Sequence, residues 1–221
     1  MKIKHPWHGA TCYDHYGWGE QGRTIDVQGF AIDRYPVTNE QFANFLETTR
    51  YQPPEKHNFL RHWHDGQIPE GLEQHPVVYV SLADARAYAA WAGKRLPPEA
   101  EWQYAAQGTD GRAWPWGDAL DSDRVNPGGG TTPVGSHPGD ASPFGLHDLC
   151  GHIWHWIDDT YTDRVHTFTV LKGGSFYRLP ADASKWCIHT GPLELTSHIK
   201  VPLLSASMDW FSTVGFRCVI D

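Results

Sequence analysis

The chain has 221 residues and a formal net charge of −8 at pH 7, and its length suits one domain with a full-sized core. This acidity excludes wrapping of DNA or RNA, because phosphate binding needs a basic surface, and no apolar run reaches the roughly 20 residues of a membrane-spanning helix. The 22 glycines, 16 prolines and 11 tryptophans predict an ordered domain with many fixed loops, held together by aromatic rings.

The chain is predicted to open with an irregular segment, residues 1–23. Its early lysines are followed by no apolar stretch, so the sequence predicts no signal peptide and a cytoplasmic protein. Residues 24–33 alternate polar and apolar side chains, which is typical of strands. Thr38 is expected to begin the first helix, because Gln41 three residues later completes a capping box.

Two further helices are predicted in the first half of the chain. Ser81 and Asp84 form a second capping box, and that helix should stop at Gly93. Pro98 is expected near the first position of a third helix, which should end at Gly108. Turns and short strands replace the helical pattern after that point. Helices early and strands late in a single domain indicate the α+β class.

The four cysteines are widely separated and contain no C-x-x-C pair. This spacing gives little support for a zinc site or a disulfide framework. In a reducing compartment they are expected to be free thiols that behave as small buried hydrophobes. They are Cys12, Cys150, Cys187 and Cys218.

Eight sequence blocks occur in the order seen in one known family. Together they resemble the sulfatase-modifying-factor family, which includes formylglycine-generating enzyme and the C-terminal domains of ergothioneine- and ovothiol-type sulfoxide synthases. The resemblance runs from about residue 24 to the end and implies the family's variant of the C-type lectin fold, in agreement with the α+β prediction. The blocks are YPVTNEQF (35–42), HPVVYVS (75–81), AAWAGKRLP (89–97), EAEWQYAA (99–106), WPWG (114–117), GLHDLCGHIWHW (145–156), LKGGS (171–175) and GFRC (215–218).

The start of the chain departs from this family. Members usually open with a strand reading like Ile-Pro-Gly-Gly-x-Phe-x-Met-Gly, which this sequence lacks. The departure leaves open a trimmed chain, a truncated reading frame or a subgroup with a shorter start. Other domains of a longer parent protein are therefore among the expected partners.

The resemblance also raises the question of whether this chain has the family's copper oxidase site. The family's enzymes hold copper with two cysteines between the GGS and GFR blocks, because soft Cu(I) prefers thiolates. Here that interval contains one cysteine, Cys187, with His189 close by. Formylglycine synthesis is therefore not expected. Cys187 and His189 are the catalytic candidates for an alternative function, a copper or non-haem iron oxidase or a C–S bond-forming enzyme.

Histidine clusters offer little for an iron site. The sulfoxide synthases hold iron with three histidines that belong largely to a separate N-terminal domain. The chain has two local groups that could substitute, and both are expected to be ordinary solvated or hydrogen-bonded histidines. They are His5, His8 and His15 in one group, and His62 and His64 in the other.

A structural calcium site is the third chemistry that the resemblance implies. Carried over by position, its ligands are the Asp148 side chain, the carbonyls of Gly151 and Ile153, and residue 155, where this chain has His155 in place of a glutamate. Calcium takes oxygen ligands, so imidazole removes one of two charged ligands. An empty site, a water in place of His155, or a softer ion such as Zn²⁺ on His155 with Asp148 or His152 all remain open.

The resemblance also implies that the segment 176–213, between the GGS and GFR blocks, lines the ligand-facing surface of the fold. A loop rich in aromatic side chains with a few polar groups favours recognition, so the predicted function is binding of a small molecule, glycan or peptide. Variable proteins of diversity-generating retroelements use the same region, and a structural module of a larger enzyme is a further alternative. Trp114, Trp116, Trp154 and Trp156 are expected in the core. The predicted ligand-binding residues are Tyr177, Arg178, Trp186, His189, His198, Asp209, Trp210 and Phe211.

Overall fold

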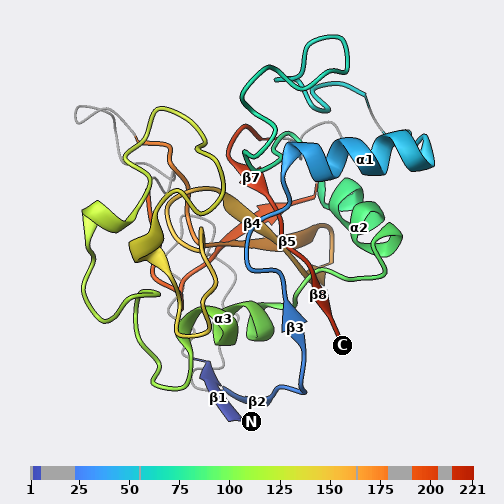
Figure 1. The fold of residues 1–221 in the computed structure, drawn as a ribbon. Coiled ribbons are helices and arrows are strands. Elements are labelled where there is room, and N and C mark those ends of the chain that lie inside the picture. Colours follow the sequence, from blue (N-terminus) through green and yellow to red (C-terminus); the bar gives the residue numbers. More distant parts are fainter. Residues whose placement is uncertain (1, 6–22, 55, 163, 179–190, 204–210) are drawn as a thin grey trace.

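A computed structural model describes residues 2–5, 23–54, 56–162, 164–178, 191–203 and 211–221 (Figure 1). The helices are α1 (Asn39–Thr49), α2 (Leu82–Trp91) and α3 (Glu99–Gln107), with 3₁₀ turns η1 (Ser122–Arg124) and η2 (Pro138–Asp140). The strands are β1 (Lys2–His5), β2 (Arg23–Asp26), β3 (Ala31–Ile32), β4 (Trp154–Thr162), β5 (Thr167–Lys172), β6 (Ile199–Pro202), β7 (Val214–Gly215) and β8 (Val219–Ile220). This order confirms the α+β class.

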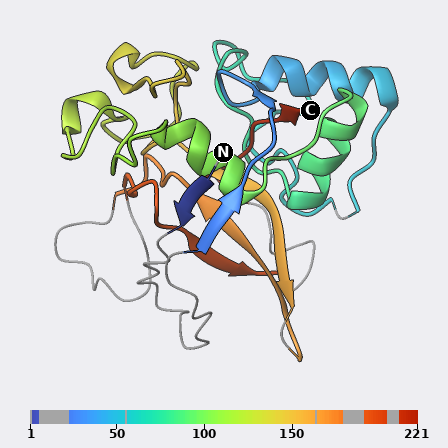
Figure 2. The same cartoon turned by 90° about the horizontal axis from the view of Figure 1, so that it is seen from below.

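The main sheet has the strand order β6-β5-β4-β7. β4 and β5 form an antiparallel hairpin, while β7 runs parallel to β4. Two small antiparallel pairs, β1 with β2 and β3 with β8, complete the described sheets. Seen from below, α1 and α2 lie together at one side, and the β4–β5 hairpin extends away from the helices (Figure 2).

Two of the predicted helix starts are confirmed. Thr38 caps α1 and Ser81 caps α2, each in a complete capping box. At α3 the structure differs, because Pro98 is the N-cap residue and provides no side-chain hydrogen bond. The missing cap comes from β4, where the Asp159 carboxylate accepts from the Glu99 amide at 2.5 Å. A carboxylate suits a helix N-terminus, where amides are unpaired and the dipole is positive.

The core consists of two clusters on either side of the main sheet's central strands. The first joins α1, α2 and the C-terminal strands through stacked rings such as Phe42 on Tyr88, with ring centroids 5.7 Å apart. The second lies under α3 and includes Trp102 and Trp114. Trp154 and Trp156 are also buried, as predicted, whereas Trp116 is only half-buried and packs against the second cluster from outside.

The start of the chain is more regular than the sequence predicted. Residues 2–5 form β1 and pair with β2 in a register that places Ile3 opposite Ile25. The four residues are too few to carry a periodic signal, and their partner strand lies far along the sequence. Residues 6–22 lie outside the described part of the chain.

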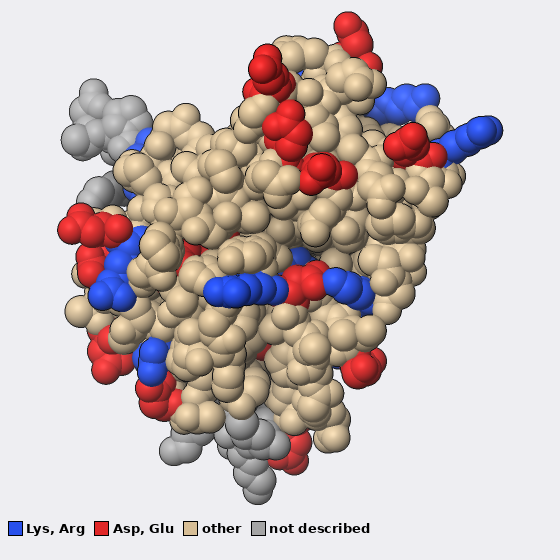
Figure 3. Space-filling view, in the orientation of Figure 1, with Lys and Arg blue, Asp and Glu red and all other residues tan. Residues whose placement is uncertain are grey.

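The surface carries its acidic surplus unevenly. Figure 3 shows acidic side chains over the upper part of one face, where α1 and the loop between α1 and α2 lie. Lys and Arg on this face lie singly or beside acidic groups (Figure 3). Within the described residues, no helix is long and apolar enough to cross a membrane.

Candidate functional site

The predicted ligand-binding segment begins directly after β5, at a glycine turn. Its first residues are paired with Gly191, because the Ser175 amide donates to the Gly191 carbonyl at 3.0 Å and the Gly191 amide donates to the Tyr177 carbonyl at 2.8 Å. Of the predicted binding residues, Trp186, His189, Asp209 and Trp210 lie outside the described residues, as does the catalytic candidate Cys187. The other four are described.

Two of these four residues are exposed aromatic side chains. Tyr177 is 45% exposed and Phe211 is 37% exposed, so both rings face the surface at opposite ends of the segment. Exposed aromatic rings on a braced backbone are suited to recognition, because they present large contact areas at little entropic cost.

The Arg178 side chain binds backbone carbonyl groups and does not face a ligand surface freely. Its guanidinium donates to the Ser175 carbonyl at 2.7 Å and to the Asn126 carbonyl at 3.0 Å. Burial lowers the pKa of Arg178 from its ordinary value. The side chain therefore joins the glycine turn after β5 to the loop that contains Asn126.

His198 is buried, 3% exposed, below the predicted surface. Its Nδ1 lies 2.9 Å from Oε1 of Glu99, and the Lys172 Nζ donates to the same oxygen at 3.1 Å. The three side chains form a buried charged group between α3, β5 and the start of β6. His198 thus contributes to the interior in this structure.

Tyr79, which the sequence analysis did not assign to ligand binding, lies beside Phe211. The Tyr79 amide donates to the Phe211 carbonyl at 3.0 Å, and the Tyr79 ring stacks on His62 with centroids 5.6 Å apart. Leu60 and Tyr79 both have left-handed backbone conformations, with φ of 48° and 56°. Such conformations cost about 1–3 kcal/mol each and cluster at ligand sites. The sequence carries no local signal for a left-handed tyrosine.

The His62 and His64 pair does not form a metal site. His62 is half-buried and lies 3.1 Å from Asn39 Oδ1, while His64 is exposed. Burial lowers the pKa of His62 to about 4, so its ring is neutral at pH 7. Among the described residues, no group of three or more His, Cys, Asp or Glu side chains could hold a metal ion.

The two described cysteines are buried free thiols, as the sequence predicted. Cys218 lies in the cluster of α1 and α2, and Cys150 lies in the cluster under α3. Burial raises the pKa of the Cys218 thiol to about 12 and also raises that of Cys150. Neither thiol is a thiolate at neutral pH, so neither is prepared for copper binding or nucleophilic attack.

The predicted calcium residues occupy a buried turn before β4. Asp148 has φ of 57°, and its carboxylate lies 3.0 Å from His152 Nδ1 and accepts from the Gly135 amide at 2.7 Å. Burial opposes ionisation of Asp148, but its bonds to His152 and Gly135 outweigh burial and lower the pKa of the carboxyl. His155 is buried on β4, where its Nδ1 accepts from the Trp102 indole at 3.2 Å.

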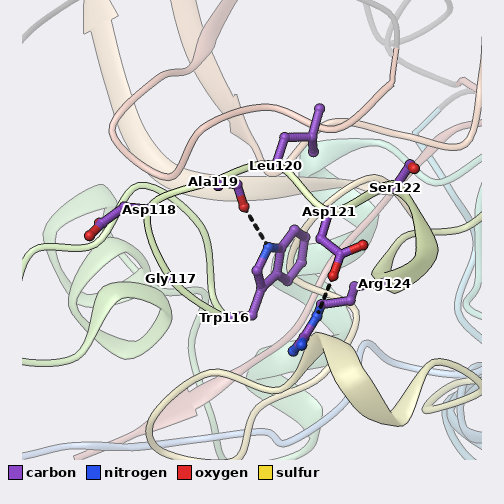
Figure 4. Close-up of a pocket in the computed structure, with 8 residues that line it drawn as sticks. All are labelled: Trp116, Gly117, Asp118, Ala119, Leu120, Asp121, Ser122 and Arg124. Carbon is purple, nitrogen blue, oxygen red and sulfur yellow. Dashed lines mark hydrogen bonds and ion pairs between the residues drawn. The ribbon is translucent and has the colours of Figure 1, made fainter.

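A hollow of about 480 Å³ lies outside these regions, lined by residues 116–122 and Arg124 (Figure 4). Several of its polar groups are bonded to one another or to nearby backbone, such as the Gly139 carbonyl, which accepts from Arg124 at 2.9 Å. The Trp116 indole donates to the Ala119 carbonyl at 2.9 Å, and Asp121 pairs with Arg124 at 2.8 Å. Trp116 also stacks on buried Trp114, with centroids 5.9 Å apart. These contacts account for the loop's own structure.

Two solved structures share the fold of this chain. The chain resembles PvdO from Pseudomonas aeruginosa with a TM-score of 0.66 and 20% identity, covering 99% of this chain and 90% of PvdO. It resembles CarF with a TM-score of 0.63 and 22% identity, covering 90% and 89% of the two chains. At these identities the likeness concerns the fold.

The family profile of the sulfatase-modifying factor enzyme 1-like domain matches residues 9–221, so the chain belongs to this family. It is 34% identical to the formylglycine-generating enzyme of Mycobacterium tuberculosis, covering 90% of this chain and 89% of that enzyme. It is 34% identical to the inactive C-alpha-formylglycine-generating enzyme 2 of Mus musculus, covering 70% and 66%.

A third group of relatives is longer. The chain is 34% identical to the serine/threonine-protein kinase Pkn1 of Chlamydia trachomatis, covering 89% of this chain but 34% of the kinase. A second chlamydial kinase of this name is 36% identical, with 33% of its length covered. The chain thus spans about a third of the length of these kinases.

Proposed function

We propose that this chain is a ligand-binding domain of the sulfatase-modifying-factor family, and that it recognises a small molecule, glycan or peptide through the 176–213 surface. The observation that carries the proposal is the pair of exposed rings, Tyr177 and Phe211, at the two ends of the 176–213 segment, where backbone hydrogen bonds join Tyr177 to Gly191 and Phe211 to Tyr79. The Tyr79 backbone is bonded to Phe211, and the half-buried Tyr79 ring stacks on His62. Aromatic anchors of this kind dominate binding energy at recognition surfaces.

The composition of the segment supports binding over oxidase chemistry. Cys187 is the one cysteine between Ser175 and Gly215, whereas a Cu(I) site of the family type needs two thiolates. The name of the mouse relative describes that protein as inactive, so the family contains members without the oxidase activity. The chlamydial kinases support a role for such a domain inside longer proteins.

Replacing Phe211 with Ala is expected to weaken ligand binding at least tenfold, because truncation of an aromatic anchor typically costs more than about 1.4 kcal/mol. Ligands would first be found by tryptophan fluorescence with panels of methyl glycosides, nucleosides and short peptides. Trp91→Ala is the matched control, because Trp91 is 36% exposed on α2 and Phe211 is 37% exposed. Equal losses in both variants, or binding unchanged in Phe211→Ala, would contradict the proposal.

A metal-dependent oxidase or C–S bond-forming enzyme is the second candidate. It is favoured by the 34% identity to a formylglycine-generating enzyme over nearly its whole length. Elemental analysis of untagged protein purified without chelator tests it. The binding proposal expects well under one copper or iron per chain, with no change in Cys187→Ala or His189→Ala. Near-stoichiometric metal that these variants lose would establish the oxidase candidate instead, and oxygen consumption would be measured next.

A further inference from the structure

The turn that precedes β4 is closed by hydrogen bonds whose proton positions can be assigned. The Thr132 amide donates to His152 Nε2 at 3.1 Å. Because an amide N–H can only donate, Nε2 carries no proton and Nδ1 carries one. The Nδ1–H of His152 therefore donates to the Asp148 carboxylate, 3.0 Å away. The other Asp148 oxygen accepts from the Gly135 amide at 2.7 Å.

The same reasoning fixes the proton of His155. The Trp102 indole N–H can only donate, so His155 Nδ1 accepts and the proton lies on Nε2. With Nδ1 accepting and Nε2 protonated, the His155 ring is neutral. Its Nε2 is buried and has no hydrogen-bond partner among the described residues. Residue 155 thus presents an N–H where the family resemblance has a carboxylate.

These residues do not fit a calcium ion. Calcium takes six to eight oxygen ligands, and Asp148 is the one carboxylate of the implied set, with both oxygens already bonded. Arg217 adds positive charge, because its guanidinium donates to the carbonyls of His147 at 2.6 Å and Asp148 at 3.3 Å. A softer ion such as zinc fits no better, since His152 and His155 each use their lone pair to accept from an N–H.

We propose that hydrogen bonds within the chain have replaced the calcium ion at this turn, with His152 donating to Asp148 in place of the cation, so that the folded domain is indifferent to calcium. Two residues account for the replacement. In the family that the sequence resembles, the segment corresponding to residues 151–156 reads Gly-Asn-Val-Trp-Glu-Trp, and this chain has His152 and His155 in place of that asparagine and glutamate. The inference concerns the fold and does not depend on the proposed ligand surface.

Thermal unfolding of the unaltered chain is the first test. The midpoint is expected to be the same, within about 1 °C, in millimolar calcium and in EDTA. A calcium site with a Kd of about 10 µM would instead raise the midpoint by roughly 5–10 °C at about 1 mM calcium. A rise of that size, or calcium-binding heat in calorimetry, would overturn the inference.

The reverse test restores the family residues. His155→Glu, alone and with His152→Asn, is expected to lower the midpoint in EDTA, because a carboxylate is then buried without a cation, and to recover by several degrees in calcium. His155→Gln is the matched control, since it has the length of glutamate without the charge, and it should not respond to calcium.

A folded double variant without a calcium response up to about 5 mM would contradict the inference, because the substituted residues would then not be what excludes the ion. If neither glutamate variant folds in EDTA, refolding in calcium replaces the melting comparison, and no recovery there counts against the inference. His152→Asn alone adds an independent measurement. Its melting midpoint should be lower than that of the unaltered chain, because the hydrogen bond from His152 to Asp148 is lost. Calcium should not restore the midpoint, because residue 155 still lacks a carboxylate.

Discussion

Replacing Lys172 with Met is expected to lower the free energy of unfolding by about 3–5 kcal/mol. Lys172 is fully buried on β5, and its Nζ donates to Glu99 at 3.1 Å while lying over the Trp102 ring. Burial lowers the pKa of Lys172, and the opposing attraction of Glu99 raises it. Removing the ammonium leaves the Glu99 carboxylate in the interior without that positive charge. Urea denaturation followed by circular dichroism measures the loss.

The double variant Lys172→Met/Glu99→Gln separates the ion pair from simple packing. It should lose less than the two single variants together, because a neutral amide beside a methionine leaves no unpaired buried charge. The control is the exposed ion pair of Arg86 with Asp158, whose side chains are 44% and 38% exposed. Arg86→Met should cost under about 1 kcal/mol. Additive losses at Lys172 and Glu99 would show that the two are not coupled.

The parts of the fold that follow from local chemistry could be predicted from the sequence. The two capping boxes need only residues three positions apart, and both formed as predicted. The cap of α3 could not be found this way, because Pro98 offers no side-chain hydrogen bond and Asp159 comes from β4. The family and its fold could be recognised because eight motifs occur in order, which is a property of the whole chain.

The candidate site was predicted less completely, because whether a side chain is exposed depends on contacts with residues far away in the sequence. Histidine is a residue type that often binds ligands, but His198 is buried and contacts the Glu99 carboxylate on α3. Arg178 would suit an anionic ligand, yet backbone carbonyls take up its donors. Tyr79 lies in a motif that reads as an ordinary apolar run, and only the folded chain places it beside Phe211. Tyr177 and Phe211 were predicted from composition and are exposed in the structure.

Gly174→Ala is expected to be among the most destabilising single-methyl additions in this chain, at roughly 3 kcal/mol or more. Gly174 has φ of 78°, and a Cβ there would overlap the Gly191 carbonyl oxygen and lie 2.8 Å from the Leu193 amide nitrogen. Both obstacles are backbone, which cannot rotate away as a side chain could. The same backbone at Gly191 is hydrogen-bonded to Tyr177, so the variant should also disturb the surface that carries Tyr177.

Gly145→Ala separates the clash from the strain of a left-handed backbone. Gly145 also has φ of 78°, but a Cβ there would meet nothing within 4 Å, so only the conformational cost of about 1 kcal/mol is expected. The difference between the two variants in urea denaturation therefore measures how rigidly the chain at Gly191 is held against Gly174 and the start of the segment. Equal losses would mean that the returning chain moves aside easily. The brace that presents Tyr177 would then be too weak to order a recognition surface before the ligand arrives.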